Sequence, residues 1–244
     1  MQVLTRIALT GLVLGVGFSH AAAQAPAGAL SHTMYMQLGP GPGQLQAFEE
    51  ARGRAIEHRR EHGFAWDEFV AIDENNIVRI STTLPNGWAD LAARRAWFLD
   101  TPRSNSGVFE VAGVLGTEIG EFLPEFSYQP ENPRVAQGEG GFVREIRVYP
   151  SPGSFNQIQE FMSGFRQAMI DMDSDQNRGV ARNIVGDGGF SLSVYYPATD
   201  PADYHAARQA LLPIFDGLPS ASIFQRIQNI NWTPRQDLNF TVDN

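Results

Sequence analysis

In some segments of the chain, hydrophobic residues occur at every second position, as in strands. In others they recur every three or four positions, as in helices. After residue 31 this change from one period to the other predicts the element order β-α-β-β-α-β. The expected strands and helices are His32–Leu38, a helix over Gln44–His62, strands over Phe64–Ile72 and Ile77–Leu84, a helix over Trp88–Leu99 and a strand over Glu121–Gln129. The turn residues Asp73-Glu74-Asn75-Asn76 predict a hairpin between the two middle strands.

The second half of the chain repeats this order. Its expected elements are a strand Phe142–Tyr149, a helix Phe155–Met172, strands Ala181–Val185 and Phe190–Tyr196, a helix Pro201–Phe215 and a strand Ser222–Trp232. Local matches support a duplication, because Pro42-Gly43 and Pro152-Gly153 both precede the first long helix of a half. Tyr128-Gln129-Pro130 and Trp232-Thr233-Pro234 likewise match at the two ends. The sequence therefore predicts two copies of one unit.

A β-α-β-β-α-β unit is the ferredoxin-like plan, and one copy leaves a face of its sheet partly uncovered. The predicted fold class is α+β, with two tandem βαββαβ ferredoxin-like repeats packed as a pseudo-dimeric α+β barrel. By element order and duplication, the chain resembles the dimeric α+β barrel superfamily in a single-chain form, which includes antibiotic-biosynthesis-type monooxygenases and chlorite dismutases. Two independent domains without a shared barrel are the structural alternative.

The predicted domain boundaries follow from composition. Residues 31–129 form the first repeat, residues 130–141 a Pro- and Gly-rich linker, and residues 142–240 the second repeat. Residues 101–120 are longer than the matching connection of the second half, and we expect a short helix or lid within Ser104–Leu115.

The first long helices of the two halves differ on the face that should point to the core. Aligned from the Pro-Gly pairs, the second helix carries Phe155, Ile158, Met162, Phe165, Met169 and Met172, a core-facing stripe. The matching residues of the first helix are Leu45, Phe48, Arg52, Ala55, Arg59 and His62. Buried guanidinium groups need a carboxylate or a bound anion. We therefore predict that Arg52 and Arg59, beside the small Ala55, bind an anionic or aromatic ligand.

Two other interpretations of these arginines stay open. Their stems could lie on apolar surface while the charged ends reach water. Alternatively, an internal carboxylate such as Asp67, Glu68 or Glu125 could hold their charge.

Candidate chemistry centres on His62, which we expect to act as the base of an oxygenase-like reaction. Trp66, Tyr35 and Trp88 are the expected aromatic walls of the ligand pocket. Haem is a candidate cofactor implied by the resemblance alone, with His62 or His205 as its ligand. His58 and His62 are spaced like half of a metal site, but no third ligand lies nearby, and no metal site is predicted.

Composition excludes several classes of chemistry. The chain has no cysteine, and its 18 basic residues are all arginine. Thiol nucleophiles, iron–sulfur clusters, lysine Schiff bases and the lysine of a phosphate-binding loop are therefore ruled out. The net charge of -9 argues against nucleic-acid partners.

The chain begins with the pattern of a signal peptide over residues 1–23. Arg6 precedes an apolar run over Ile7–Phe18, and Ala21-Ala22-Ala23 provides a cleavage site. The apolar run is too short for a convincing membrane span. We expect an exported protein, periplasmic or secreted, without stable membrane insertion.

These observations predict an exported protein that binds a small anionic or aromatic molecule in the first repeat, as a monomer or a weak homo-oligomer. The alternatives are a monooxygenase-like or haem-dependent oxidoreductase, and a structural protein without a ligand.

Overall fold

The computed structural model describes residues 32–136, 139–186, 189–216 and 223–242. The predicted signal peptide lies outside the described residues. Among the described residues, no helix combines the length and the apolar character that crossing a membrane requires.

Each half of the chain folds as expected into a β-α-β-β-α-β unit. The elements of the first repeat are β1 (His32–Pro40), α2 (Leu45–Glu61), β2 (Glu68–Asp73), β3 (Val78–Leu84), α3 (Trp88–Asp100), α4 (Val108–Val111) and β4 (Ala112–Phe122). Those of the second repeat are β5 (Phe142–Pro150), α5 (Phe155–Asp171), β6 (Gly179–Val185), β7 (Ser191–Ala198), α6 (Pro201–Asp216) and β8 (Phe224–Pro234), followed by the 3-10 helix η2 (Gln236–Leu238).

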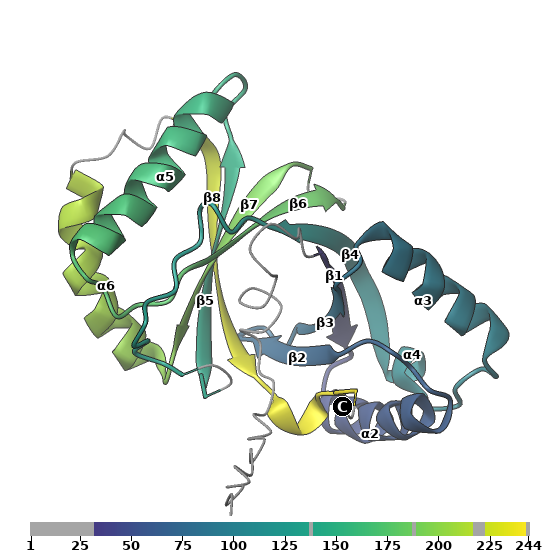
Figure 1. Ribbon diagram of the computed structural model, residues 1–244. Coiled ribbons are helices and arrows are strands. Elements are labelled where there is room, and N and C mark those ends of the chain that lie inside the picture. Colours follow the sequence, from purple (N-terminus) through teal and green to yellow (C-terminus); the bar gives the residue numbers. More distant parts are fainter. Residues whose placement is uncertain (1–31, 137–138, 187–188, 217–222, 243–244) are drawn as a thin grey trace, which may run out of the picture.

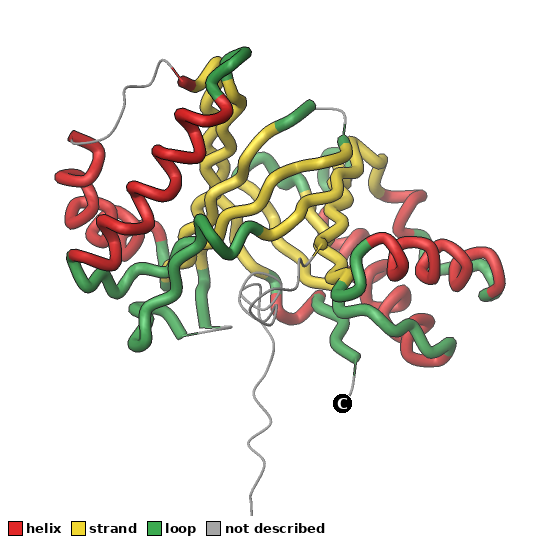
Figure 2. The backbone as a smooth tube through the Cα atoms, turned by 45° about the horizontal axis from the view of Figure 1, so that its top comes forward, coloured by secondary structure: helices red, strands yellow, loops and turns green. Residues whose placement is uncertain are grey.

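The strands close into one barrel in the order β1-β3-β2-β8-β5-β7-β6-β4. Within each repeat the strand order is that of a ferredoxin-like sheet, and the two sheets join where β2 pairs with β8 and β4 pairs with β6, both antiparallel. Helices α2, α3 and α4 lie outside one half of the barrel, and α5 and α6 outside the other (Figures 1 and 2). The predicted pseudo-dimeric α+β barrel is thus confirmed.

Strand alternation separates two faces with different chemistry. Val70 and Ile72 of β2 point outward and pack with α2 in an apolar cluster. The residue between them, Ala71, points inward, where it packs with Val143 and Trp232 of the other repeat. Residues of both repeats therefore line the interior of the barrel.

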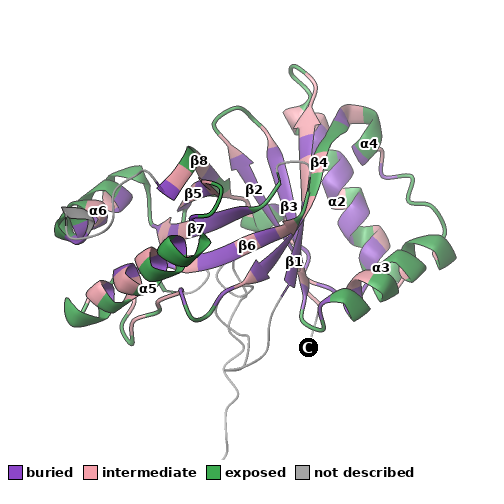
Figure 3. Ribbon diagram, turned by 90° about the horizontal axis from the view of Figure 1, so that it is seen from above, coloured by how far each residue is buried: buried purple, intermediate pink, exposed green. Residues whose placement is uncertain are grey.

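The helices of the two repeats cover their sheets unequally. In the second repeat, α5 buries Ile158, Met162, Phe165 and Met169 in a continuous apolar core, to which α6 adds Tyr204 and Leu211. In the first repeat, α2 is well buried, but Asp90 is the one buried residue of α3. Figure 3 shows α3 as largely exposed beside the buried face of α2. Helix α3 therefore buries fewer residues than its counterpart α6 does.

The last strand of the first repeat was predicted too late in the sequence. β4 spans Ala112–Phe122, whereas Tyr128 makes only an isolated bridge to Arg178. Three glycines of β4 weaken the sequence signal for a strand, which explains the error. One of them, Gly120, is required by packing, because a Cβ there would lie 2.8 Å from Cε2 of Tyr35 on the paired strand β1. The short helix expected within Ser104–Leu115 is α4.

Candidate functional site

A buried cluster of arginines surrounds Glu68 on the helix side of the first sheet. Glu68, the first residue of β2, is fully buried, and its Oε2 lies 2.8 Å from Arg52 Nη1 and 2.8 Å from Arg59 Nε. Arg94 of α3 approaches from the other side, with Nη2 at 3.6 Å from Glu68 Oε1. The cluster thus joins α2, β2 and α3.

This cluster carries more positive than negative charge. In the part of the chain that the structure describes, Glu68 is the one carboxylate in ion-pairing distance of Arg52, Arg59 and Arg94. Arg52 Nη2 and Arg94 Nε are buried without a hydrogen-bond partner among the described residues. Burial lowers the pKa of both Arg52 and Arg94, because the charged form loses its hydration there. Three guanidinium groups facing one carboxylate leave two positive charges uncompensated.

The same charges act on Glu68. Burial alone would raise the pKa of Glu68, but the three arginines outweigh burial and lower this pKa to about 2. Glu68 is therefore ionised at neutral pH. Its role as an internal partner was one of the two alternatives to ligand binding by Arg52 and Arg59; their ligand-binding role stays a prediction.

Aromatic rings line this arginine cluster. Phe64 lies under two guanidinium groups, with its ring centroid 5.2 Å from Arg59 Cζ and 5.8 Å from Arg94 Cζ. Trp66 and Trp97 pack edge-to-face against Phe64. The site therefore combines excess cationic charge with aromatic surface, a pairing suited to an aromatic anion.

Helix α3 forms the outer wall of this region. Its side chains include the exposed Trp88, Phe98 and Leu99, which are 52%, 45% and 75% exposed. Near its start, Trp88 meets the ring of His32 edge-to-face at 5.6 Å. His32 is buried, and its Nδ1 has no hydrogen-bond partner among the described residues. Sequence reasoning missed both His32 and Arg94; their spacing from neighbouring apolar residues gave no clear signal.

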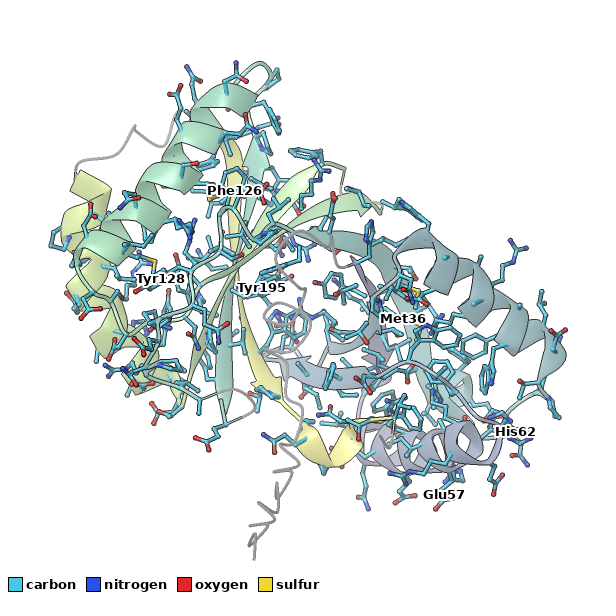
Figure 4. The ribbon with its side chains drawn as sticks, viewed as in Figure 1. Met36, Glu57, His62, Phe126, Tyr128 and Tyr195 are labelled. Atoms are coloured by element: carbon cyan, nitrogen blue, oxygen red, sulfur yellow. The ribbon has the colours of Figure 1, made fainter. Side chains whose placement is uncertain are left out.

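The structure separates the other predicted site residues. Ala55 is buried in α2, and its carbonyl accepts a hydrogen bond from Arg59 Nη1 at 3.0 Å. Trp66 lies in the aromatic wall, but Tyr35 faces the barrel interior, where Arg79 Cζ lies 5.3 Å from its ring. His62 follows the end of α2 at the outer edge of the repeat (Figure 4). Trp97 of the aromatic wall donates to the His62 carbonyl oxygen at 2.9 Å, so His62 adjoins this wall, whereas Tyr35 does not belong to it.

The two histidines named for haem lie in different repeats, and their role as ligands stays a prediction. His62 stacks on His58 at 4.3 Å, and its Nδ1 contacts the His58 carbonyl oxygen at 2.9 Å. His205 lies exposed on α6 beside Tyr204, over a sheet face that is filled by the apolar core. Across the described residues, no three His, Asp or Glu side chains gather as metal ligands.

A second charged cluster lies inside the barrel, and its members come from both repeats. Glu145 of β5 is fully buried and bonds Arg79 of β3, with Arg79 Nη1 at 2.5 Å from Glu145 Oε2. Ser193 and the Trp232 indole also donate hydrogen bonds to Glu145, each at 2.8 Å. Tyr195, which Figure 4 places between the repeats, has its pKa raised by burial and by nearby Glu145.

These features define the class of the molecule as a single-chain, pseudo-dimeric α+β barrel with a buried arginine site in one repeat. No family model matches the sequence, and no curated protein matches it.

Solved structures share the fold. A candidate monooxygenase from Fusobacterium nucleatum superposes with a TM-score of 0.58 at 9% identity, covering 85% of this chain and 93% of that one. A variant of chlorite dismutase from Candidatus Nitrospira defluvii gives 0.57 at 8% identity, over 89% and 94% of the two chains. An anthrone oxidase-like protein gives 0.50 at 12% identity, over 88% and 93%. The chain therefore has the fold of the dimeric α+β barrel superfamily, a resemblance at the level of fold.

Proposed function

We propose that the protein binds a small aromatic anion in the first repeat, between α3 and the sheet, at the cluster of Arg52, Arg59 and Arg94. The observation that carries the proposal is the charge imbalance around Glu68, where three guanidinium groups, on side chains that are at most 11% exposed, face one carboxylate. Uncompensated charge in a low-dielectric site is costly, and a bound anion would remove that cost.

Arg94 is the residue through which an anion would reach the cluster. Its side chain is 11% exposed, close to the 10% of Arg59, whereas that of Arg52 is 1% exposed. Of the three arginines, Arg94 also lies farthest from Glu68, at 3.6 Å compared with 2.8 Å for Arg52 and for Arg59. An aromatic carboxylate could pair with Arg94 while its ring packs on Phe98, which lies 4.7 Å from Arg94 Cζ.

The test compares Arg94→Gln with Arg95→Gln, a control on the same helix whose side chain is exposed. We expect benzoate at a hundredfold excess over its Kd to raise the Tm of the wild-type protein by roughly 5–10 °C. Arg95→Gln should keep this shift, and Arg94→Gln should lose most of it. Calorimetric titration with benzoate, and with neutral benzyl alcohol as the matched ligand, measures the affinity directly.

An equal response to benzoate and benzyl alcohol would refute the proposal, as would an unchanged benzoate affinity in folded Arg94→Gln. Sulfate, an anion without an aromatic ring, tests the arginines separately from the aromatic wall. If sulfate stabilises as well as benzoate, the arginines bind anions but the aromatic wall has no role in selection.

A second candidate is an oxygenase-type oxidoreductase acting without a cofactor on a phenol or anthrone. It is supported by the fold shared with monooxygenase-like proteins and by buried His32, whose Nδ1 has no hydrogen-bond partner among the described residues. In such a reaction an anthrone methylene and O₂ yield a carbonyl and water. Oxygen uptake with anthrone should then be seen in the wild-type protein and be lost in His32→Ala. If the wild-type protein takes up no oxygen, the oxygenase function is refuted and ligand binding is the remaining proposal.

We further infer that the protein acts outside the cytoplasm, since residues 1–23 have the composition of a signal peptide. Detection of a mature form that begins at Gln24 in the exported fraction would support this inference.

A further inference from the structure

A cavity of about 290 Å³ opens at one end of the barrel, away from the arginine cluster of the first repeat. It lies between the two repeats, since β1, the β2–β3 hairpin and β4 supply one side and β5 and β8 the other. Its lining residues with ionisable side chains are Asp73, Glu74, Glu118 and Arg147. Gln228 of β8 is among its neutral lining residues. Its volume is near the lower limit for small-molecule sites, about 300 Å³.

The single cation of this cavity is already engaged. Arg147 Nη1 donates to Glu118 Oε1 at 2.8 Å, and its Nη2 and Nε lie 3.0 and 3.1 Å from Glu145 Oε1. Despite burial, Glu145 and Glu118 raise the pKa of Arg147. All three nitrogen groups of Arg147 therefore have partners, and the cavity offers little to an anion.

Acceptors, in contrast, are in excess. Glu118 Oε2 is buried and has no hydrogen-bond partner among the described residues. Asp73 and Glu74 add two more carboxylates at the mouth, where Asp73 Oδ1 accepts the Asn75 and Ile77 amides. Glu74 Oε2 accepts the Asn231 amide at 3.2 Å, which fixes that side chain across the repeats. The lining therefore has a net negative charge and includes a carboxylate oxygen without a hydrogen-bond partner among the described residues.

These carboxylates do not converge as metal ligands would. Among the described residues, no group of three or more His, Asp or Glu side chains is close enough to hold a metal ion. A ligand that spans the cavity and carries its positive charge at one end fits the spacing better than a bare ion does.

We propose that this barrel-end cavity binds a small organic cation, with an ammonium or guanidinium group on Glu118 Oε2 and an aliphatic portion extending toward Gln228. The site is separate from the anion site of the first repeat and has the opposite charge preference. A cation at Glu118 supplies the missing donor to a buried carboxylate oxygen, which is costly to leave unpaired.

The experiment measures binding of butylguanidine and butylamine to the full mature chain by calorimetry, with butylurea and butanol as neutral ligands of matched size. We expect the cations to bind at least tenfold more tightly than their neutral counterparts. Glu118→Gln should weaken cation binding by tenfold or more, because its amide can still accept from Arg147 but the charge is gone. Glu131→Gln, an exposed carboxylate outside the cavity, should leave binding unchanged.

A second pair of variants keeps the test independent of the charge network. Gln228→Trp places a large side chain in the cavity at an exposed position and should abolish binding, whereas Gln225→Trp on the same strand should not. Equal affinity for charged and neutral ligands, the absence of cation binding at millimolar concentration, or full binding by Gln228→Trp would overturn the proposal. Arg94→Gln should bind the cations as the wild type does, so failure at one site is distinguishable from failure at the other.

Discussion

Two fully buried glutamates organise the charged residues of this protein. Glu68 holds the arginines of the first repeat, and Glu145 holds Arg79 and Arg147 inside the barrel. In both cases burial would raise the pKa, but the surrounding arginines lower it to about 2. Removing one partner of such a pair costs about 3–5 kcal/mol, because the remaining charges stay buried without compensation.

The low pKa values of Glu68 and Glu145 predict a stability that falls in acid. A carboxylate with a folded pKa of about 2 and an unfolded pKa of about 4.3 contributes its full stabilisation above the unfolded value. This stabilisation, roughly 3 kcal/mol for each group, is lost as the pH falls from about 4.5 toward about 2. Urea unfolding between pH 2 and pH 7 measures it.

Glu68→Gln provides the matched variant for this pH dependence. It should lose about 3–5 kcal/mol at pH 7 and show a shallower decline in acid than the wild type. Exposed Glu61→Gln should stay within about 0.5 kcal/mol at every pH. Parallel pH profiles for wild type and Glu68→Gln would contradict the assignment of the low pKa.

At the scale of elements, α3 differs from every other long helix of the described chain. It buries Asp90 alone, whereas its counterpart α6 buries Tyr204, Ala207, Leu211 and Ile214. Little apolar surface therefore holds α3 to the sheet, and local opening of such an element costs less free energy than global unfolding.

We expect the amides of α3 to exchange with solvent faster than those of α2 and α5. Hydrogen exchange followed by mass spectrometry resolves the three helices as separate peptides. Benzoate should slow the exchange of α3 selectively if Arg94 contributes to its binding. Protection of α3 equal to that of α5 in the free protein would show that α3 is held as firmly as the core helices.

At the scale of the whole molecule, the barrel joins the repeats through paired strands and buried charge. β2 pairs with β8, β4 pairs with β6, and the Arg79–Glu145 ion pair crosses between the repeats. Since each repeat supplies part of the other's interior, separate unfolding would expose Ala71, Val143 and Trp232 together.

The protein should consequently unfold in one cooperative transition. Tryptophan fluorescence reports mainly on the first repeat through Trp66 and Trp97, and far-ultraviolet circular dichroism reports on both repeats. The two melting curves should coincide, and Glu145→Gln should shift both by the same amount. Two separated transitions would mean that the repeats are independent in stability despite the shared barrel.

Periodicity predicted the fold because the outward faces of the strands and the inner faces of the helices are apolar in regular order. The last strand of the first repeat escaped this pattern, since its three glycines carry no hydrophobic signal, and one of them, Gly120, packs against Tyr35. The comparison of the two long helices indicated the inward Arg52 and Arg59, which are buried. Arg94 could not be linked to them, because its contact with Glu68 depends on how α3 lies over the sheet.

The charged cluster inside the barrel was not anticipated for a related reason. The residues of this cluster are Arg79, Glu145 and Arg147, which lie in predicted strands between apolar neighbours. This alternation indicates only that the charged side chains point to one side of each strand. Which strands face each other across a closed barrel is a property of topology, and local sequence does not specify it. The domain boundaries and the roles of the site residues remain predictions.

The contact between Gly120 and Tyr35 has a consequence for how this chain can change over generations. A methyl group on Gly120 would strike the phenol ring, so a larger residue there is tolerated only when residue 35 shrinks as well. Shrinking residue 35 would in turn uncover the guanidinium of Arg79, which now lies 5.3 Å from that ring. We therefore expect descendants of this sequence to alter these three positions jointly or to keep all of them.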